Sequence, residues 1–265
     1  MNQGLRIENF SAGYPKRQVI DNLSVPMLPR GQITVLLGPN GSGKSTLLRS
    51  LAGLNPAQGK LWLDDDDLMQ MPFARRAEKV VYLPQSLPAG VHLHVLESII
   101  VAQRASGGRS NAGSEAEVMA LLEQLGIAHL ALSYLDQLSG GQKQLVGLAQ
   151  SLIRQPSLLL LDEPTTYLDI AHQIELLDLF RQLNRERGQT LIAVLHDLNH
   201  ACRYADHIIA MRDGKIVAEG KPAEIITAEL VERVFGMPCM IIDDPLSHTP
   251  LVIPRGRYHC DAPQA

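Results

Sequence analysis

Apolar residues along the chain fall into short runs, and the spacing within each run predicts its secondary structure. Leu5, Ile7 and Phe10 alternate with polar neighbours, which is typical of a strand with one buried face. Three other runs are almost continuously apolar, which is typical of parallel strands covered on both faces. They are Ile33–Leu37, Ser157–Leu161 and Thr190–Leu195. Shorter strands are predicted at Gly59–Leu63, Lys79–Leu83, His207–Met211 and Lys215–Ala218.

Apolar residues at helical spacing occupy the segments between these strands. They repeat from Ile174 to Leu183, between the second and third buried runs, and so predict the strand–helix–strand alternation of an α/β protein. Helices are also predicted at Val95–Gln103 and Glu117–Leu125, on either side of an exposed loop, Ser106–Ser114. The middle of the chain therefore has the pattern of a helical insert.

Composition and charge narrow the classes of protein. The chain of 265 residues has 45% hydrophobic and 20% charged residues, which fits a globular protein. Its net charge of −4 argues against a surface for nucleic acid. Three cysteines favour a reducing compartment, and we expect neither a signal peptide nor a membrane span, which needs roughly 18 apolar residues.

Two clusters that resemble metal sites are interpreted more simply. Four consecutive aspartates, Asp64–Asp67, are expected to form a solvated turn, because no calcium-binding loop spacing follows them. His259, Cys260 and Asp261 are expected to belong to a disordered tail.

The strongest motif follows the first buried run. Its spacing is G-x-x-x-x-G-K-S, the pattern of a P-loop, with a predicted strand before it and a helix after it. Backbone N–H groups of such a loop cradle phosphate oxygens, Lys44 reaches the outer phosphates, and Ser45 is placed to ligate Mg²⁺. The predicted nucleotide-binding residues are Gly38, Pro39, Asn40, Gly41, Ser42, Gly43, Lys44, Ser45 and Thr46.

Polar residues that follow buried strands supply candidate catalytic groups. Asp162 and Glu163 end the run Leu158–Leu161, and ligands bind at this edge of open α/β sheets. We expect Asp162 to hold Mg²⁺ and Glu163 to act as the general base. His196 is expected to orient the attacking water, and Gln85 to hydrogen-bond water or Mg²⁺, with a plain loop glutamine as the alternative for Gln85.

A second candidate anion site is Ser139-Gly140-Gly141-Gln142, at the start of the predicted helix Lys143–Ile153. Unpaired N–H groups and the helix dipole favour phosphate at such a position. Alone this is an ordinary helix cap, but chance explains it poorly beside a P-loop and an Asp-Glu pair.

Together these motifs resemble the nucleotide-binding subunit of an ATP-binding-cassette (ABC) transporter, over nearly the whole chain. Residues 38–46 resemble its Walker A motif, 138–142 its signature motif and 158–163 its Walker B motif. Four single residues complete the resemblance, each at the matching position of a family motif. They are Gln85 in the Q-loop, Asp169 in the D-loop, His196 in the H-loop and Tyr14, placed in a loop, as the aromatic that stacks on adenine.

The resemblance implies an α/β P-loop NTPase fold with a mixed sheet core, an N-terminal antiparallel β subdomain and an inserted α-helical subdomain. It implies a catalytic core at 1–85 and 156–240, a helical subdomain at 86–155 that carries the signature motif, and a C-terminal extension at 241–265. It also implies a head-to-tail dimer in which Ser139, Gly140 and Gly141 of one copy close over ATP held by the other.

Further partners and the cargo follow from the same resemblance. We expect membrane permease subunits, an indirect solute-binding protein, and a location on the cytoplasmic face of the inner membrane. Residues 164–173, 196–201 and 239–252 resemble iron-siderophore, haem and vitamin B12 importers, ferric enterobactin members among them. The alternatives are a haem or cobalamin importer, a soluble ABC ATPase of the iron–sulfur assembly type, or a regulatory module without turnover.

Overall fold

The computed structural model describes residues 3–86, 91–105 and 114–256. Its strands are β1 (Gly4–Tyr14), β2 (Arg17–Pro29), β3 (Ile33–Leu37), β4 (Ala57–Leu63), β5 (Asp66–Asp67), β6 (Val80–Leu83), β7 (Leu158–Asp162), β8 (Thr190–Val194), β9 (His207–Arg212), β10 (Lys215–Gly220), β11 (Cys239–Asp243) and β12 (Pro250–Pro254). Its α-helices are α1 (Lys44–Leu51), α2 (Phe73–Lys79), α3 (Val95–Ala105), α4 (Ser114–Gln124), α5 (Gly140–Leu152), α6 (Ile170–Arg187), α7 (Leu198–Tyr204), α8 (Pro222–Ile225) and α9 (Ala228–Phe235). Two short 3-10 helices lie at Ala128–Leu130 and Leu135–Gln137.

The central sheet has the strand order β10-β9-β3-β8-β7-β6. β3 pairs in parallel with β8 and β9, and β7 pairs in parallel with β6 and β8, whereas β10 pairs antiparallel with β9. A separate antiparallel sheet has the order β2-β1-β4-β5. The predicted α/β fold with a mixed core sheet and an N-terminal antiparallel sheet is confirmed.

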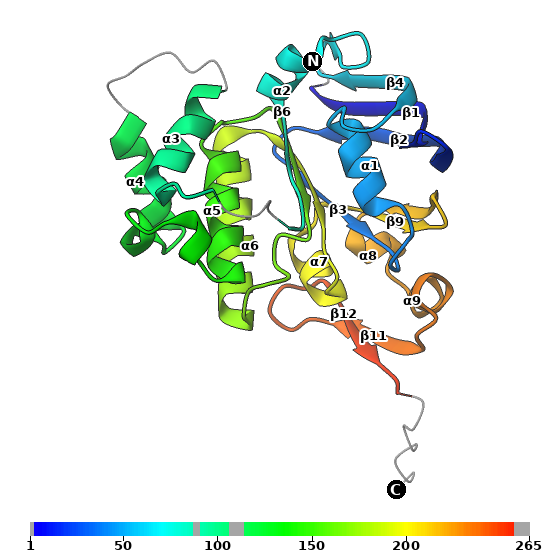
Figure 1. Ribbon diagram of the computed structural model, residues 1–265. Helices are drawn as coiled ribbons and strands as arrows, with labels where there is room; N and C mark the ends of the chain where they lie inside the picture. Colours follow the sequence, from blue (N-terminus) through cyan, green and yellow to red (C-terminus); the bar gives the residue numbers. More distant parts are fainter. Residues whose placement is uncertain (1–2, 87–90, 106–113, 257–265) are drawn as a thin grey trace, which may run out of the picture.

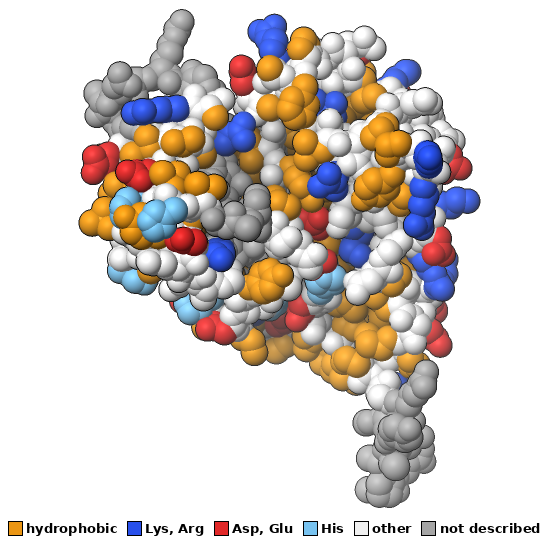
Figure 2. All heavy atoms as spheres, in the orientation of Figure 1, with side chains coloured by type: hydrophobic (Ala, Val, Ile, Leu, Met, Phe, Trp, Pro, Cys, Tyr) orange, Lys and Arg blue, Asp and Glu red, His pale blue; other side chains and the backbone are white. Residues whose placement is uncertain are grey.

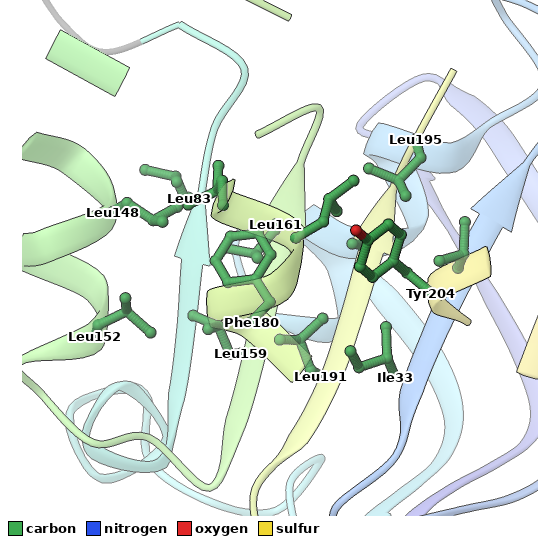
Figure 3. Close-up of a cluster of buried hydrophobic side chains, with 14 of the residues drawn as sticks. Ile33, Leu83, Leu148, Leu152, Leu159, Leu161, Phe180, Leu191, Leu195 and Tyr204 are labelled. Atoms are coloured by element: carbon green, nitrogen blue, oxygen red, sulfur yellow. The ribbon is translucent and has the colours of Figure 1, made fainter. Parts of the chain in front are cut away.

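The central sheet is buried on both faces because its strands are apolar throughout. Along β7, Leu159 and Leu161 belong to the apolar cluster on the helical side of the sheet, while Leu158 and Leu160 face α1 and the antiparallel sheet. Figure 3 shows Phe180 of α6 among the leucines of the helical side. Because β3, β6, β7 and β8 run parallel, their carboxyl ends meet at one edge of the sheet, where functional side chains can converge.

The predicted helical insert is present as α3, α4 and α5, which Figure 1 shows together on one side of the central sheet. Its core is continuous with the helical face of the sheet, since Val118 and Leu148 share one buried cluster with Leu161. The predicted loop Ser106–Ser114 lies outside the described residues up to residue 113, and Ser114 begins α4. His259, Cys260 and Asp261 also lie outside the described residues.

Two local predictions need correction. Tyr14 is the last residue of β1 and pairs with Arg17 of β2, so it belongs to a strand and not to a loop. The aspartate run is only partly a turn, because Asp66 and Asp67 form β5. Asp64 forms an ion pair with Arg30, and within the described residues no group of three or more His, Cys, Asp or Glu side chains could hold a metal ion.

The segment after α9 folds into an antiparallel hairpin, β11–β12, that packs on α7 (Figure 1). The amide of Asn199 in α7 bonds to the backbone of Val252 in both directions: Val252 N donates to Oδ1 at 2.7 Å, and Nδ2 donates to the Val252 carbonyl at 3.3 Å. Val252 is 3% exposed, so this pairing ties the hairpin into the molecule next to the helix that follows His196.

Candidate active site

The loop between β3 and α1 forms a tight cradle because two of its glycines have no alternative. A Cβ on Gly38 would lie 2.2 Å from the carbonyl oxygen of Met211, which leaves no room for a side chain. Gly43, the N-cap of α1, has φ of 99°, a left-handed conformation that glycine adopts without strain. The backbone therefore turns sharply into α1, whose first N–H groups have no partner within the helix.

Lys44 lies inside this cradle and not in solvent. Its side chain is 5% exposed, and Nζ donates to the carbonyls of Gly38 at 2.8 Å and Pro39 at 2.9 Å. Burial lowers the pKa of Lys44, while the carboxylates of Glu163 and Asp162 act in the opposite direction. The loop thus holds a cation at its centre by its own carbonyl oxygens, where an anion can exchange for them.

A cavity of about 260 Å³ opens over the cradle. One wall is Tyr14, which is 49% exposed and presents an aromatic ring at the mouth. Arg17 also lies in this wall and was not predicted from the sequence; it lies three residues after Tyr14 and pairs with it across the β1–β2 turn. The complete lining is Tyr14, Arg17, Val19, Asn40, Gly41, Gly43, Lys44, Ser45, Thr46 and Glu163.

Asp162 is fixed beside the cradle at the end of β7. It is 2% exposed, Ser45 Oγ donates to Oδ1 at 3.1 Å, and the hydroxyl of Tyr82 donates to Oδ2 at 3.0 Å. Burial raises the pKa of Asp162, and the two hydrogen bonds oppose that shift. Tyr82 was not predicted as a site residue. It reaches Asp162 because β6 pairs with β7, and that pairing is not visible in the sequence pattern.

This pair of oxygen donors fits Mg²⁺. The ion binds proteins through one or two carboxylates or hydroxyls and takes its remaining ligands from substrate phosphates and water. Ser45 and Asp162 supply such a pair at the rim of the phosphate cradle. Gln85, also predicted as a ligand, donates to Glu163 and forms no hydrogen bond with Ser45 or Asp162 among the described residues.

Glu163 is the centre of the second cluster. Its backbone adopts φ of 53°, which turns the chain away from β7. Gln85 Nε2 donates to Oε2 at 2.5 Å, Thr166 Oγ1 donates to the same oxygen at 3.2 Å, and His196 Nε2 lies 2.6 Å from Oε1. The three predicted catalytic residues therefore meet at one carboxylate that lines the cavity, and Thr166 is an unpredicted fourth member.

The start of α5 lies outside this cavity. Ser139 caps the helix in a reciprocal arrangement: Gln142 N donates to Ser139 Oγ at 3.3 Å, and Ser139 N donates to Gln142 Oε1 at 3.0 Å. Gly140 and Gly141 pack against Tyr167, where a Cβ on Gly141 would lie 2.9 Å from the carbonyl oxygen. These four predicted residues are not brought to the cradle of their own chain.

Asp169 lies apart from the cavity as well. It caps α6, accepting from His172 N at 3.0 Å, and Nδ1 of His172 lies 2.8 Å from the same oxygen. These hydrogen bonds hold the pKa of the Asp169 carboxyl below its usual value. Its side chain is 68% exposed, so it faces solvent in a single copy of the chain.

A phosphate cradle, an Asp–Ser pair and a Glu–His–Gln cluster at the carboxyl edge of a mixed sheet define a P-loop nucleotide-binding protein. The chain belongs to the ABC transporter family, which it matches over residues 20–166. It is 48% identical to the ferric enterobactin transport ATP-binding protein of Escherichia coli K12, over 96% of this chain and 94% of that protein. It is 44% identical to a probable siderophore transport system ATP-binding protein of Bacillus subtilis, over 97% and 95%.

Solved structures agree with this assignment. The chain resembles an ATP-binding cassette solved as a dimer in a post-hydrolysis state with ADP and Pi, with TM-score 0.75 and 26% identity, over 82% of this chain and 98% of that one. It also resembles a chain of a transporter described as of the metal-chelate type, in an inward-facing conformation, with TM-score 0.80 and 26% identity, over 97% and 99%. Within the described residues, no helix combines the length and apolarity needed to cross a bilayer.

Proposed function

We propose that this chain is the ATP-hydrolysing subunit that energises import of a ferric siderophore through a membrane permease. The observation that carries the enzymatic part is Glu163, a carboxylate that lines the cavity over the P-loop and contacts both His196 and Gln85. Two polar side chains therefore meet this carboxylate at the mouth of a phosphate cradle. The arrangement is that of a general base held by positioning groups.

The proposed hydrolysis follows from these contacts. Tyr14 stacks on the adenine, and the N–H groups of the cradle with Lys44 bind the phosphates. Water placed at Glu163 attacks the terminal phosphorus, its proton passes to the carboxylate, and the bond to the bridging oxygen breaks, releasing ADP and phosphate. His196 holds the carboxylate and the water in line. Mg²⁺, held by Ser45 and Asp162, would neutralise charge on the phosphate oxygens.

The proposed dimer completes the site. Ser139, Gly140, Gly141, Gln142 and Asp169 lie outside the cavity of their own chain, so their predicted nucleotide contacts require a second copy arranged head to tail. Closure of two copies over two ATP molecules would drive the permease, through residues 86–155, on the cytoplasmic face of the inner membrane. The division into a core at 1–85 and 156–240 and an extension at 241–265 belongs to the same proposal.

The names of the relatives support a ferric siderophore as the cargo. Relatives named for enterobactin, achromobactin and siderophore transport are 48%, 46% and 44% identical to this chain, whereas one named for hemin import is 36% identical. We therefore favour a siderophore over haem or cobalamin, and over a soluble ABC ATPase.

The variant Glu163→Gln tests the enzymatic part. Loss of a general base lowers rates by about 10²–10⁴-fold, so phosphate release falls by that factor while ATP binding persists. Glu175→Gln, an exposed position of α6, is the matched control. Undiminished phosphate release in Glu163→Gln would contradict the assignment and favour a regulatory module without turnover.

Growth on defined iron sources tests the cargo. Cells without the gene should lose growth on ferric enterobactin or a related chelate as sole iron source. The intact gene should restore that growth, and Glu163→Gln should not. Loss of growth on haem alone, with siderophore growth unchanged, would transfer the assignment to a haem importer.

A further inference from the structure

A second cavity, of about 180 Å³, lies at the opposite edge of the central sheet from the P-loop. It is lined by Ile33, the first residue of β3, and by Asp206, which immediately precedes β9. The P-loop follows the last residue of β3, so the length of a five-residue strand, roughly 15 Å, separates the two cavities. The other walls come from α6 and from the end of α7.

Three arginines line this cavity, in a chain whose net charge is −4. Arg181 is fixed in place: Nη2 donates to the carbonyl of Arg203, and the guanidinium carbon lies 4.5 Å from the centroid of the Tyr204 ring. Arg185 is exposed and forms no hydrogen bond or ion pair with any described residue. On the face drawn in Figure 2, by contrast, lysines and arginines are scattered among hydrophobic and acidic side chains.

The carboxylates near the cavity offset part of this charge, but they make few direct contacts with the arginines. Asp206 Oδ2 accepts from the backbone N–H of Ile33 at 2.8 Å, and Asp178 Oδ1 accepts from the hydroxyl of Tyr204 at 2.9 Å. Asp244 approaches Arg203 no closer than 3.9 Å. Among the residues that line the cavity, three arginines accompany one carboxylate, Asp206, and neither Arg181 nor Arg185 forms an ion pair with a described residue.

Asn184 is a buried polar residue in the wall of the cavity. It lines the cavity, it is 1% exposed, and its buried Oδ1 has no hydrogen-bond partner. Buried polar side chains are nearly always paired, and an unpaired one costs stability. The unpaired atom is an acceptor, so Asn184 can serve an oxyanion only by rotating its amide to present the nitrogen as a donor.

We propose that this cavity binds a small oxyanion of the phosphate class. Planar guanidinium groups donate paired hydrogen bonds to tetrahedral oxyanions, and Arg181 and Arg185 are the two whose forks are not used by carboxylates. Asn184 completes the site from its buried wall. A volume of 180 Å³ equals the share of about six water molecules, which leaves room for phosphate with part of its hydration. The site joins α6 to α7 at the ends remote from Asp169 and His196.

The test is calorimetric titration of the full-length protein with inorganic phosphate, with sulfate as a second oxyanion and chloride as the control anion. The P-loop cradle is itself an anion site, so every titration is repeated in Lys44→Ala. The proposal expects saturable phosphate binding that persists in Lys44→Ala. Arg185→Gln should weaken it by about tenfold, the effect of losing one charged hydrogen bond, and Arg185→Glu should abolish it.

Arg75→Gln is the matched control, because Arg75 is exposed on α2 and does not line the cavity. It should leave phosphate binding unchanged. Crystals soaked in tungstate should show anomalous density beside Arg185 and Asn184. Binding that vanishes in Lys44→Ala and survives in Arg185→Glu would assign all phosphate to the P-loop and overturn the proposal. Equal effects of the Arg75 and Arg185 substitutions, or no binding at all, would overturn it as well.

Discussion

Two helices of this protein begin with a glycine-rich turn, yet the two beginnings are built differently. At α1 the backbone encloses a concave cradle, and Lys44 is buried within it. At α5, Ser139 and Gly140 are exposed, and the N–H groups are partly occupied because Ser139 and Gln142 cap each other. A glycine-rich helix start therefore forms an enclosed cradle at α1 and an exposed, capped helix end at α5.

Under the proposed function, the chain divides phosphate binding between these two helix starts. The cradle needs only its own loop to bind a phosphate, and it does so at the edge of a sheet buried on both faces. The start of α5 keeps its shape without a ligand because of its capping box, so it is ready to meet a phosphate carried by another copy. Its contact with Tyr167 links it to the segment between Glu163 and Asp169.

The substitution Ser139→Arg should change ATP turnover the most, and it tests the start of α5 separately from the cradle. In Ser139→Arg the bulky cation blocks approach of a second copy, and we expect ATP turnover to fall by on the order of 10²–10³-fold, as on loss of a transition-state donor. ATP binding to the monomer should be unchanged, because Ser139 does not line the cavity. Lys44→Ala should instead weaken ATP binding itself, by about 10–100-fold.

Titration with a fluorescent ATP analogue measures binding, phosphate release measures turnover, and sedimentation with ATP measures dimer formation. Gln58→Arg, an exposed position in β4, is the control for an added cation and should change none of the three. Full ATP turnover in Ser139→Arg would contradict the proposal that the start of α5 completes the site of another copy.

A smaller effect is expected at the mouth of the cavity. Tyr14→Ala removes the aromatic wall and should weaken ATP binding by roughly 1–3 kcal/mol, the usual contribution of a base stacked on an aromatic ring. Tyr14→Phe should retain most of the affinity, since the face of the ring is kept. An unchanged dissociation constant in Tyr14→Ala would remove this residue from the site.

The smallest effect concerns stability and pH. Burial raises the pKa of Asp162 above the ordinary value of 3.8. The folded state therefore holds this proton more tightly than the unfolded state, and the free energy of unfolding falls as pH rises through the interval between the two pKa values. Asp162→Asn has no such loss, so without nucleotide it should melt a few degrees higher near neutral pH.

The gain should shrink as pH falls and should vanish below 3.8, where the wild-type carboxyl is protonated in both states. Scanning calorimetry across that range measures it, with Asp65→Asn, an exposed aspartate, as the control. A variant that melts lower than the wild type at every pH would show that the carboxylate stabilises the empty cradle.

Most of the fold was predictable because its central strands are apolar without interruption. β3, β7 and β8 were placed from their hydrophobic runs to within a residue or two, and the P-loop was placed by the strand and helix beside it. The convergence of Gln85, Glu163 and His196 was predictable in outline. Parallel strands bring their carboxyl ends to one edge, whatever their distance along the chain.

What could not be predicted depends on contacts between distant segments. Tyr82 and Asp162 are 80 residues apart, and only the pairing of β6 with β7 joins them. Arg17 enters the nucleotide cavity through the register of β1 on β2, which no local pattern encodes. The oxyanion cavity likewise needs α6 and α7 to be packed at their far ends, so its arginines look like ordinary surface residues in the sequence.

The two-way amide pairing of Asn199 with Val252 fastens the last described strand to the helix that starts just after His196. A chain cut short after α9 would leave that amide without its backbone partner and would bare the apolar side of α7. The β11–β12 hairpin thus supports the helix that follows His196, the proposed catalytic histidine, and its removal is expected to reduce activity before it unfolds the protein.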